Sequence, residues 1–545
     1  MRRVVLIVLL ALGCAKKGLP PLAVQNVVDA AHDAKPLLFI GLDGADWRML
    51  DPLIADGTMP ALGALVRGGE RRVLRTQQPP LSPLVWTSMM TGVSPLEHRI
   101  LDFTRFNPAT REREPITSDE RAVPAIWNMA TYGGKRVDVI GMWATAPAEV
   151  VNGAIVTDRD VLSHQPEVLA RIDEQTANVH RAAMERLRAD RPDLGIVYIQ
   201  GTDEIGHVTG GNVEAARDYF RRIDGMLAEY VAWAQEHGAQ IVVASDHGFD
   251  WGGSQRQSST ATATAAKWHR DEGIYLRWPG NGTKEEANAD QLCATLLALS
   301  GLPPDARLAP AIGVESGATT FDYRRYFKRA AAASGSAGGS EAVAQLKALG
   351  YIGGSEPSRA PAGATGSRTP ASFNNEGLIL RGMHRDADAE RAFASALQLD
   401  PNYPTAQWNL SELLLARDAA RSDALLLAAA RNGLPDGAQQ IARRAALRGT
   451  AGGAKALLDA AIAIDDGPEL RLRRGRYALE GNDCRSALAD FRAAASNAPS
   501  AVAYASIGTA AACLGDRRAA AEALERSLAI DPNQPQVRAF LDSLR

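Results

Sequence analysis

Apolar strand-like runs alternate with helical stretches over residues 36–330, and this alternation constrains the fold more than any other feature of the chain. Runs such as Pro36–Leu42, Gly195–Gln200 and Gln240–Ala244 are separated by helical stretches such as Val213–Glu236. Strands joined through helices are typical of βαβ units and a largely parallel sheet. We therefore expect an α/β domain over residues 36–330, with a largely parallel sheet sandwiched by helices.

An aspartate lies just beyond three of these strands. Asp43 follows Leu37–Leu42, Asp203 follows Ile196–Ile199, and Asp246 follows Ile241–Ala244. Ligands of open parallel sheets bind outside the carboxyl ends of the strands, so the three carboxylates can gather at one edge. One aspartate after a strand is commonly only a helix cap. Three such positions, two of them with a histidine close by, favour a ligand site.

Three histidines extend this pattern. His207 lies four residues after Asp203, His247 directly follows Asp246, and His269 lies in the segment Trp268–Ile274. Mixed aspartate and histidine ligands suit zinc, and manganese or iron less tightly. Six such ligands can hold two divalent ions about 4 Å apart, a separation suited to phosphoryl transfer. We therefore expect two divalent ions, with zinc favoured.

At these residues the chain resembles the alkaline phosphatase superfamily, especially its type I phosphodiesterase/nucleotide pyrophosphatase branch. The matching pieces occur in the family's order over about residues 36–310: Ile40–Gly44, Pro79–Pro83 leading to Trp86 and Thr91-Gly92, Asp203 with Gly206-His207, Asp246–Gly248, and His269 with Gly273. Each piece alone is weak, but five pieces in the right order are strong. The resemblance implies an alkaline-phosphatase-like fold.

The resemblance also implies a role for each residue. Asp43, Asp246 and His247 would hold the metal that touches the nucleophile, and Asp203, His207 and His269 would hold the second metal. Ser82 would be the nucleophile and itself a ligand of the first metal. Thr87, Ser88 and Thr91 are nearby rival hydroxyls, which we expect a helical turn to place in the core of the domain. Lys267 and Arg270 are candidates for substrate binding.

Three functions are compatible with this pattern. The favoured function is hydrolysis of a phosphodiester or nucleotide-like substrate through a phosphoserine intermediate. A phosphomonoesterase is the first alternative, because diesterases of this family usually carry threonine where Ser82 stands. A monoester has one more negative charge, which Lys267 or Arg270 could balance. A non-catalytic scaffold is the second alternative, but the presence of all six ligands counts against it.

A pattern recurs after residue 373. Gly377, Ala389, Phe393, Ala396 and Pro401 are matched by Gly475, Ala487, Phe491, Ala494 and Pro499, and again by Gly508, Ala520, Leu524, Ser527 and Pro532. The offsets look like tetratricopeptide repeats of about 34 residues, with room for two degenerate units between the first two matches. We expect an all-α tetratricopeptide solenoid over residues 373–545, which binds a protein or peptide partner. Residues 331–372 are rich in Gly, Ser, Ala and Pro and are interpreted as a flexible linker.

The first residues predict export. Arg2 and Arg3 precede the apolar run Val4–Leu12, which is typical of a signal peptide over residues 1–13. Cys14 resembles the cysteine of a bacterial lipobox, which implies a lipid anchor in the cell envelope, facing the periplasm, with residues 14–35 as a tether. A plainly cleaved signal is the alternative.

The other cysteines and the charge are less informative. If Cys14 is acylated, the remaining cysteines (Cys293, Cys484 and Cys513) are odd in number, so a complete disulfide framework is excluded and buried thiols are expected. Whether Cys484 pairs with Cys513 stays open. A net charge of -3 gives no sign of nucleic-acid binding.

Overall fold

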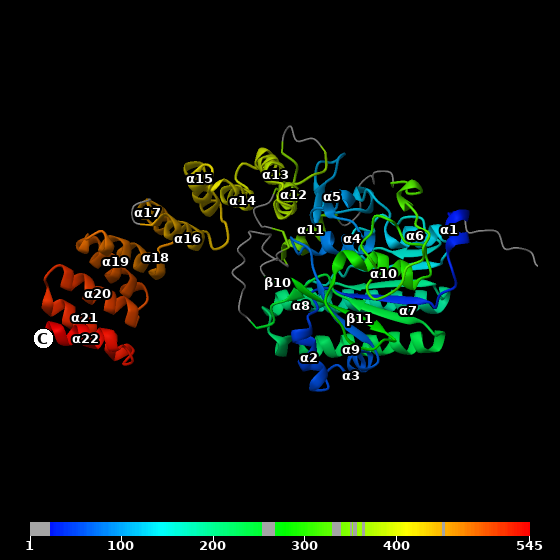
Figure 1. The fold of residues 1–545 in the computed structure, drawn as a ribbon, viewed down its shortest axis with the longest axis horizontal. Coiled ribbons are helices and arrows are strands. Elements are labelled where there is room, and N and C mark those ends of the chain that lie inside the picture. Colours follow the sequence, from blue (N-terminus) through cyan, green and yellow to red (C-terminus); the bar gives the residue numbers. More distant parts are fainter. Residues whose placement is uncertain are drawn as a thin grey trace, which may run out of the picture. The chain divides into compact units, whose positions relative to one another are not determined.

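The computed structural model of the chain describes residues 22–252, 268–329, 339–348, 351–352, 357–361, 366–449 and 453–545. Cys14 and the predicted signal peptide lie outside these residues. The chain forms two compact units, drawn in Figure 1. The first unit contains residues 22–100 and 115–252 together with 268–329, and the second contains residues 101–114 together with the described residues from 340 onward.

The first unit is built on a mixed sheet, which has nine strands in the described residues, with the main order β12-β2-β11-β8-β1-β7-β5-β6 and β13 paired with β2. The strands are β1 (Leu37–Leu42), β2 (Glu70–Arg75), β5 (Val137–Ile140), β6 (Gly153–Val156), β7 (Leu194–Ile199), β8 (Gln240–Ala244), β11 (Glu272–Trp278), β12 (Gly282–Thr283) and β13 (Ala287–Asn288). Strands β8, β1, β7, β5 and β6 are parallel neighbours, whereas β11 runs antiparallel to β8 and β2. This arrangement confirms the predicted α/β class.

Helices cover both faces of the sheet (Figure 1). On one face lie α2 (Trp47–Ala55), α3 (Pro60–Arg67), α7 (Val168–Asp190), α8 (Gly201–Thr209) and α9 (Val213–His237), and on the other lie α4 (Ser82–Thr91), α6 (Ile126–Tyr132) and α10 (Leu292–Leu299). The central strand β1 is buried along its whole length. Its residues alternate between the faces: Leu38 and Ile40 join the core under α7 and α9, whereas the ring of Phe39 contacts Trp86 of α4.

The register of the three central strands brings their carboxyl ends to one edge. Leu42 in β1 pairs with Ile199 in β7, and Gly41 pairs with Ala244 at the end of β8. The segments that follow β1, β7 and β8 therefore leave the sheet side by side. These are the segments that hold the three predicted aspartates.

The second unit is helical. Its helices are α11 (Gly339–Ala348), α12 (Pro370–Gly382), α13 (Asp386–Leu399), α14 (Pro404–Leu414), α15 (Ala419–Arg431), α16 (Gly437–Arg448), α17 (Ala454–Ile464), α18 (Pro468–Glu480), α19 (Cys484–Asn497), α20 (Ala501–Cys513), α21 (Arg517–Ile530) and α22 (Pro535–Leu544). From α12 to α21, consecutive helices pack in pairs. The pairs α14/α15 and α16/α17 occupy the interval where the sequence predicts two degenerate repeats.

The recurring small residues lie where two helices of a pair approach closely. A Cβ atom at Gly377 would lie 2.4 Å from the ring of Phe393, and one at Gly475 would lie 2.5 Å from the ring of Phe491. Since real Cβ atoms do not approach other atoms this closely, each position requires glycine. The predicted all-α region of helical repeats is confirmed.

A short hairpin also belongs to the second unit. Strands β3 (Thr104–Phe106) and β4 (Arg113–Pro115) pair with each other. Just before them, the backbone oxygen of Leu101 accepts a 2.8 Å hydrogen bond from Asn375 Nδ2, and Asp102 Oδ2 accepts one of 2.6 Å from Thr369 Oγ1. The hairpin thus packs with the first helices of the repeat array, although it lies between two segments of the first unit in the sequence.

The expectation of buried free thiols holds for one of the three described cysteines. Cys293 is a buried free thiol, as expected. Cys484 and Cys513 form a disulfide between α19 and α20, so the expectation of buried thiols is wrong for these two. They meet because consecutive repeat helices are antiparallel neighbours, which brings the start of α19 beside the end of α20.

None of the helices in the described residues has both the length and the apolar character that crossing a membrane requires.

Candidate metal centre and active site

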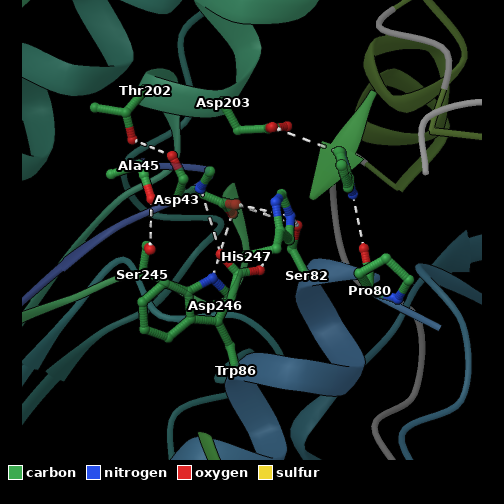
Figure 2. A network of polar contacts seen from close by, with 12 residues as sticks. Asp43, Ala45, Pro80, Ser82, Trp86, Thr202, Asp203, Ser245, Asp246 and His247 are labelled. Atoms are coloured by element: carbon green, nitrogen blue, oxygen red, sulfur yellow. Dashed lines mark hydrogen bonds and ion pairs between the residues drawn. The ribbon is translucent and has the colours of Figure 1, made fainter. Parts of the chain in front are cut away.

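Three buried aspartates meet at the carboxyl edge of the sheet (Figure 2). Asp43 directly follows β1, and its backbone oxygen accepts a 2.6 Å hydrogen bond from Thr202 Oγ1 in α8. Asp246 Oδ1 accepts a 3.3 Å hydrogen bond from the backbone N–H of Gly44. Gly44 has a φ of +63°, and a Cβ there would lie 2.7 Å from Asp203 Oδ1. A glycine at this turn is therefore what allows the three carboxylates to come together.

Two histidines are oriented by backbone carbonyl groups. His247 Nδ1 lies 3.0 Å from the oxygen of Gly248, and His269 Nδ1 lies 2.7 Å from the oxygen of Pro80. Because a carbonyl oxygen can only accept, each Nδ1 carries a proton, and Nε2 of each ring faces the aspartates. The two rings stack with their centroids 3.7 Å apart. Metal-binding histidines are commonly oriented in this way.

Ser82 lies beside the first cluster of predicted ligands, which Asp43, Asp246 and His247 form. His247 Nε2 is 3.4 Å from Asp43 Oδ1 and 3.3 Å from Asp246 Oδ2. Ser82 is the first residue of α4 and is fully buried. Its Oγ lies 3.3 Å from Asp43 Oδ1 and 3.4 Å from His247 Nε2. Figure 2 shows Ser82 among these ligands. The hydroxyl therefore faces the cluster in which the resemblance places the nucleophile.

The second cluster of predicted ligands consists of Asp203 and His207, which lie in α8, and His269. Asp203 and His207 lie one helical turn apart on the same face of α8, and His207 Nε2 is 3.2 Å from both Asp203 Oδ2 and His269 Nε2. The ligand atoms of Asp203, His247 and His269 lie within 4.8 Å of one another, as do those of Asp43, Asp246 and His247. All six predicted ligands converge, with His247 between the two clusters. The division of the six ligands between two ions stays a prediction.

The other hydroxyls of α4 make hydrogen-bond contacts inside the first unit. Thr87 Oγ1 donates to the oxygen of Pro83 at 2.6 Å, and Thr91 Oγ1 donates to the oxygen of Thr87 at 2.7 Å. Ser88 Oγ lies 3.0 Å from His98 Nε2. These contacts lie in the packed interior, which agrees with the expectation for these three hydroxyls.

Of the two candidates for substrate binding, Arg270 lies among the described residues and Lys267 does not. Arg270 lies in β10 (His269–Arg270), with Nε 3.0 Å from Asp46 Oδ2 and Nη2 3.4 Å from Glu272 Oε2. Its guanidinium is thus already paired with two carboxylates. Lys267 lies outside the described residues. For both side chains, substrate binding stays a prediction.

Burial perturbs the acidity of the three aspartates. It raises the pKa of Asp43 well above its usual value, and the nearby Asp246 and Asp203 raise it further. Burial also raises the pKa of Asp246 to about 7. Burial acts to raise the pKa of Asp203 as well, but the neighbouring histidines outweigh it and the pKa is lower than usual. Without a cation, the site therefore resists holding three ionised carboxylates.

The donor set fits divalent metal ions. In the part of the chain that the structure describes, the ion pairs of Asp43 and Asp246 are made with His247 alone. The buried Asp246 Oδ2 accepts no hydrogen bond from any described residue. Carboxylate oxygens and imidazole nitrogens in this number suit zinc, manganese or iron, and the choice among these metals stays a prediction.

Some residues around the site were not singled out from the sequence. Asp43 Oδ2 accepts hydrogen bonds from Tyr198 OH and, at 3.3 Å, from Trp86 Nε1. Glu204 is buried next to Asp203, and burial together with the charges of Asp203 and Asp43 raises its pKa to about 8. A polar ring in the otherwise aliphatic strand Leu194–Ile199 is the one sequence signal that distinguishes Tyr198.

The raised pKa of Asp246 predicts how stability depends on pH. In the metal-free protein, stability is highest when this carboxyl is protonated and falls as the pH rises from about 3.8 toward about 7. A bound cation favours the carboxylate and removes this loss. We expect Zn²⁺ to raise the Tm of chelator-treated protein much more at about pH 8 than at about pH 5. Asp246→Asn should flatten the metal-free profile, and an equal effect of Zn²⁺ at both pH values would contradict the prediction.

Comparisons with known proteins agree with this geometry. The family model for type I phosphodiesterase / nucleotide pyrophosphatase matches residues 37–298. A venom phosphodiesterase from Macrovipera lebetinus is 24% identical over 232 residues, which are 41% of this chain and 26% of the relative. The chain thus spans about a quarter of the length of the curated relatives it matches.

Solved structures are more distant. Murine ectonucleotide pyrophosphatase / phosphodiesterase 5 in complex with AMP aligns with a TM-score of 0.38 and 14% identity, covering 51% of this chain and 97% of that one. YrrB, a TPR protein with a peptide-binding site, aligns with a TM-score of 0.24 and 19% identity, covering 31% of this chain and 91% of that one. The family match agrees with the resemblance found in the sequence: residues 37–298 match the type I phosphodiesterase / nucleotide pyrophosphatase family model.

Proposed function

We propose that the chain is a metal-dependent hydrolase of phosphate esters, with a phosphodiester as substrate and Ser82 as nucleophile. One observation supports this proposal most directly: Ser82 Oγ is buried 3.3 Å from Asp43 Oδ1 and 3.4 Å from His247 Nε2, beside six converging ligands. The family match over residues 37–298 supports the same reaction class.

The proposed mechanism uses two displacements at phosphorus. When bound, the two ions would lower the pKa of the Ser82 hydroxyl and offset negative charge on the phosphoryl oxygens. Ser82 Oγ, having lost its proton to solvent, forms a bond to phosphorus while the bond to the first alcohol oxygen breaks, and that oxygen leaves as the alcohol after taking up a proton. The resulting phosphoserine still carries the second alcohol of the diester as an ester. Water then displaces Ser82 Oγ from phosphorus, releases the phosphomonoester and returns a proton to Ser82. Since Ser82 is the first residue of α4, the positive end of the helix dipole also favours negative charge at this position.

The charges around the site favour a diester over a monoester. A monoester brings one more negative charge, which calls for a further cation besides the two ions. Arg270 already forms ion pairs with Asp46 and Glu272, and these carboxylates offset its positive charge. A phosphodiester, with a single negative charge, places less demand on such a cation.

Removing the proposed nucleophile tests the mechanism. We expect Ser82→Ala to lower kcat by about 1,000-fold or more, because it removes the hydroxyl that lies within 3.4 Å of both Asp43 Oδ1 and His247 Nε2. Metal content, measured by elemental analysis, should stay at the wild-type level. Ser88→Ala is the matched control in the same helix, and its kcat should stay within a few-fold of wild type. Wild-type turnover by Ser82→Ala would reject the nucleophile.

Two chromogenic substrates test the proposed preference for phosphodiesters over phosphomonoesters. We expect kcat/KM to be higher for bis-p-nitrophenyl phosphate than for p-nitrophenyl phosphate, since the described site adds no further cation for the dianion. Both reactions release the same chromophore and can be followed in the same assay. A strong preference for the monoester would replace the diesterase by the phosphomonoesterase alternative.

We also propose that the helical unit binds a protein or peptide partner. Arrays of helix pairs form extended binding surfaces. Apolar side chains are unusually exposed here, including Val502 at 63% and Ile530 at 51%. Partners captured by the full chain should be lost when residues 468–545 are deleted. Capture that is unchanged by the deletion would place the partner surface elsewhere.

An exported location is proposed on two grounds. The first residues resemble a lipoprotein signal, and Cys484 and Cys513 form a disulfide of the kind that persists in oxidising compartments. Lipidation of Cys14 predicts that the wild-type chain sediments with the envelope membranes and that Cys14→Ala does not. Identical fractionation of both chains would argue for a plainly cleaved signal.

A further inference from the structure

The two carboxylate oxygens of Asp43 have different surroundings. Oδ1 faces the site, 3.3 Å from Ser82 Oγ and 3.4 Å from His247 Nε2. Oδ2 accepts hydrogen bonds from Tyr198 OH and Trp86 Nε1, the latter at 3.3 Å. The carboxylate is therefore held by two donors on one oxygen while the other oxygen points at the cluster.

The Tyr198 hydroxyl is itself oriented by a third ring. Trp143 Nε1 donates a 2.6 Å hydrogen bond to Tyr198 OH. An indole N–H can only donate, so the phenol oxygen accepts from Trp143 and its own proton is directed at Asp43 Oδ2. Tyr198, Trp143 and Trp86 are all buried, so water does not compete strongly for these groups.

Strand pairing and one glycine make this arrangement possible. Gly41 in β1 is the register partner of Tyr198 in β7. A Cβ at Gly41 would lie 2.8 Å from Trp86 Cη2 and 3.2 Å from Tyr198 Cδ2. The absence of a side chain lets the two rings meet edge to face, with their centroids 5.1 Å apart, in front of Asp43.

We propose that Tyr198, oriented by Trp143, is a positioning residue that holds Asp43 as a ligand through Oδ1 alone. With Oδ2 bound by two donors, the carboxylate cannot turn both oxygens toward the cluster. Loss of the hydroxyl would free Oδ2 to compete with Oδ1 and would loosen the ligand nearest to Ser82. The inference builds on the metal-dependent reaction proposed above, but its consequence is a change in metal affinity.

The experiment measures zinc affinity in the full chain, by competition with a chelator of known affinity, for wild type and Tyr198→Phe. Outer hydrogen-bond partners of metal ligands typically change metal affinity by about 10- to 100-fold. We expect a loss of this size for one of the two ions in Tyr198→Phe, and a fall in kcat on bis-p-nitrophenyl phosphate with little change in KM. Tyr230→Phe is the matched control, because it removes a buried hydroxyl that lies 3.0 Å from His180 Nδ1 instead. The control should bind zinc as wild type does.

Trp143→Phe provides a second probe that leaves the Tyr198 hydroxyl in place. Because Trp143 acts through Tyr198, we expect a smaller loss of affinity, and the double variant should bind zinc no more weakly than Tyr198→Phe alone. Wild-type zinc affinity in Tyr198→Phe, or losses that add in the double variant, would overturn the inference. Weakened zinc binding in a chain with no phosphoesterase activity would refute the proposed function and leave the positioning role standing.

Discussion

Repulsion among three enclosed carboxylates is the constraint on which the rest of this structure depends. Asp43, Asp203 and Asp246 are all buried at one edge of the sheet. Enclosing ionised groups costs free energy unless opposite charge compensates them. His207, His247 and His269 lie 3.2 to 3.5 Å from these carboxylates. Nδ1 of His247 and of His269 donates to a backbone carbonyl. The site is therefore suited to cations, and the Ser82 hydroxyl lies beside it.

The scaffold positions these groups through backbone geometry. Parallel pairing of β1 with β7 and β8 delivers the three ligand-bearing segments to one edge. Glycines occupy the points of closest approach: Gly44 lies between the carboxylates, and Gly41 lies under the rings that hold Asp43. Helix α8 spaces Asp203 and His207 by one turn, and α4 begins at Ser82. Rigid elements thus hold side chains that are far apart in the sequence.

Much of this was predictable from sequence, because the signals were local. Asp43, Asp203 and Asp246 follow apolar runs, so the edge on which they lie follows from the rule for parallel sheets. The contacts of Tyr198 were not predictable in the same way. Its partners Trp143 and Trp86 come from other elements, and only the packed arrangement shows that all three rings serve one carboxylate. The hairpin of β3 and β4 and the disulfide between Cys484 and Cys513 likewise depend on contacts between segments distant in sequence.

The central claim is that six side chains hold two cations beside Ser82. Anomalous diffraction at the zinc edge, from crystals of the chain grown with Zn²⁺, tests this claim most directly. The account predicts two peaks about 4 Å apart, one within bonding distance of Asp43 and Asp246 and the other within bonding distance of Asp203 and His269. A site with no peak, or with a single peak remote from Ser82, would contradict it.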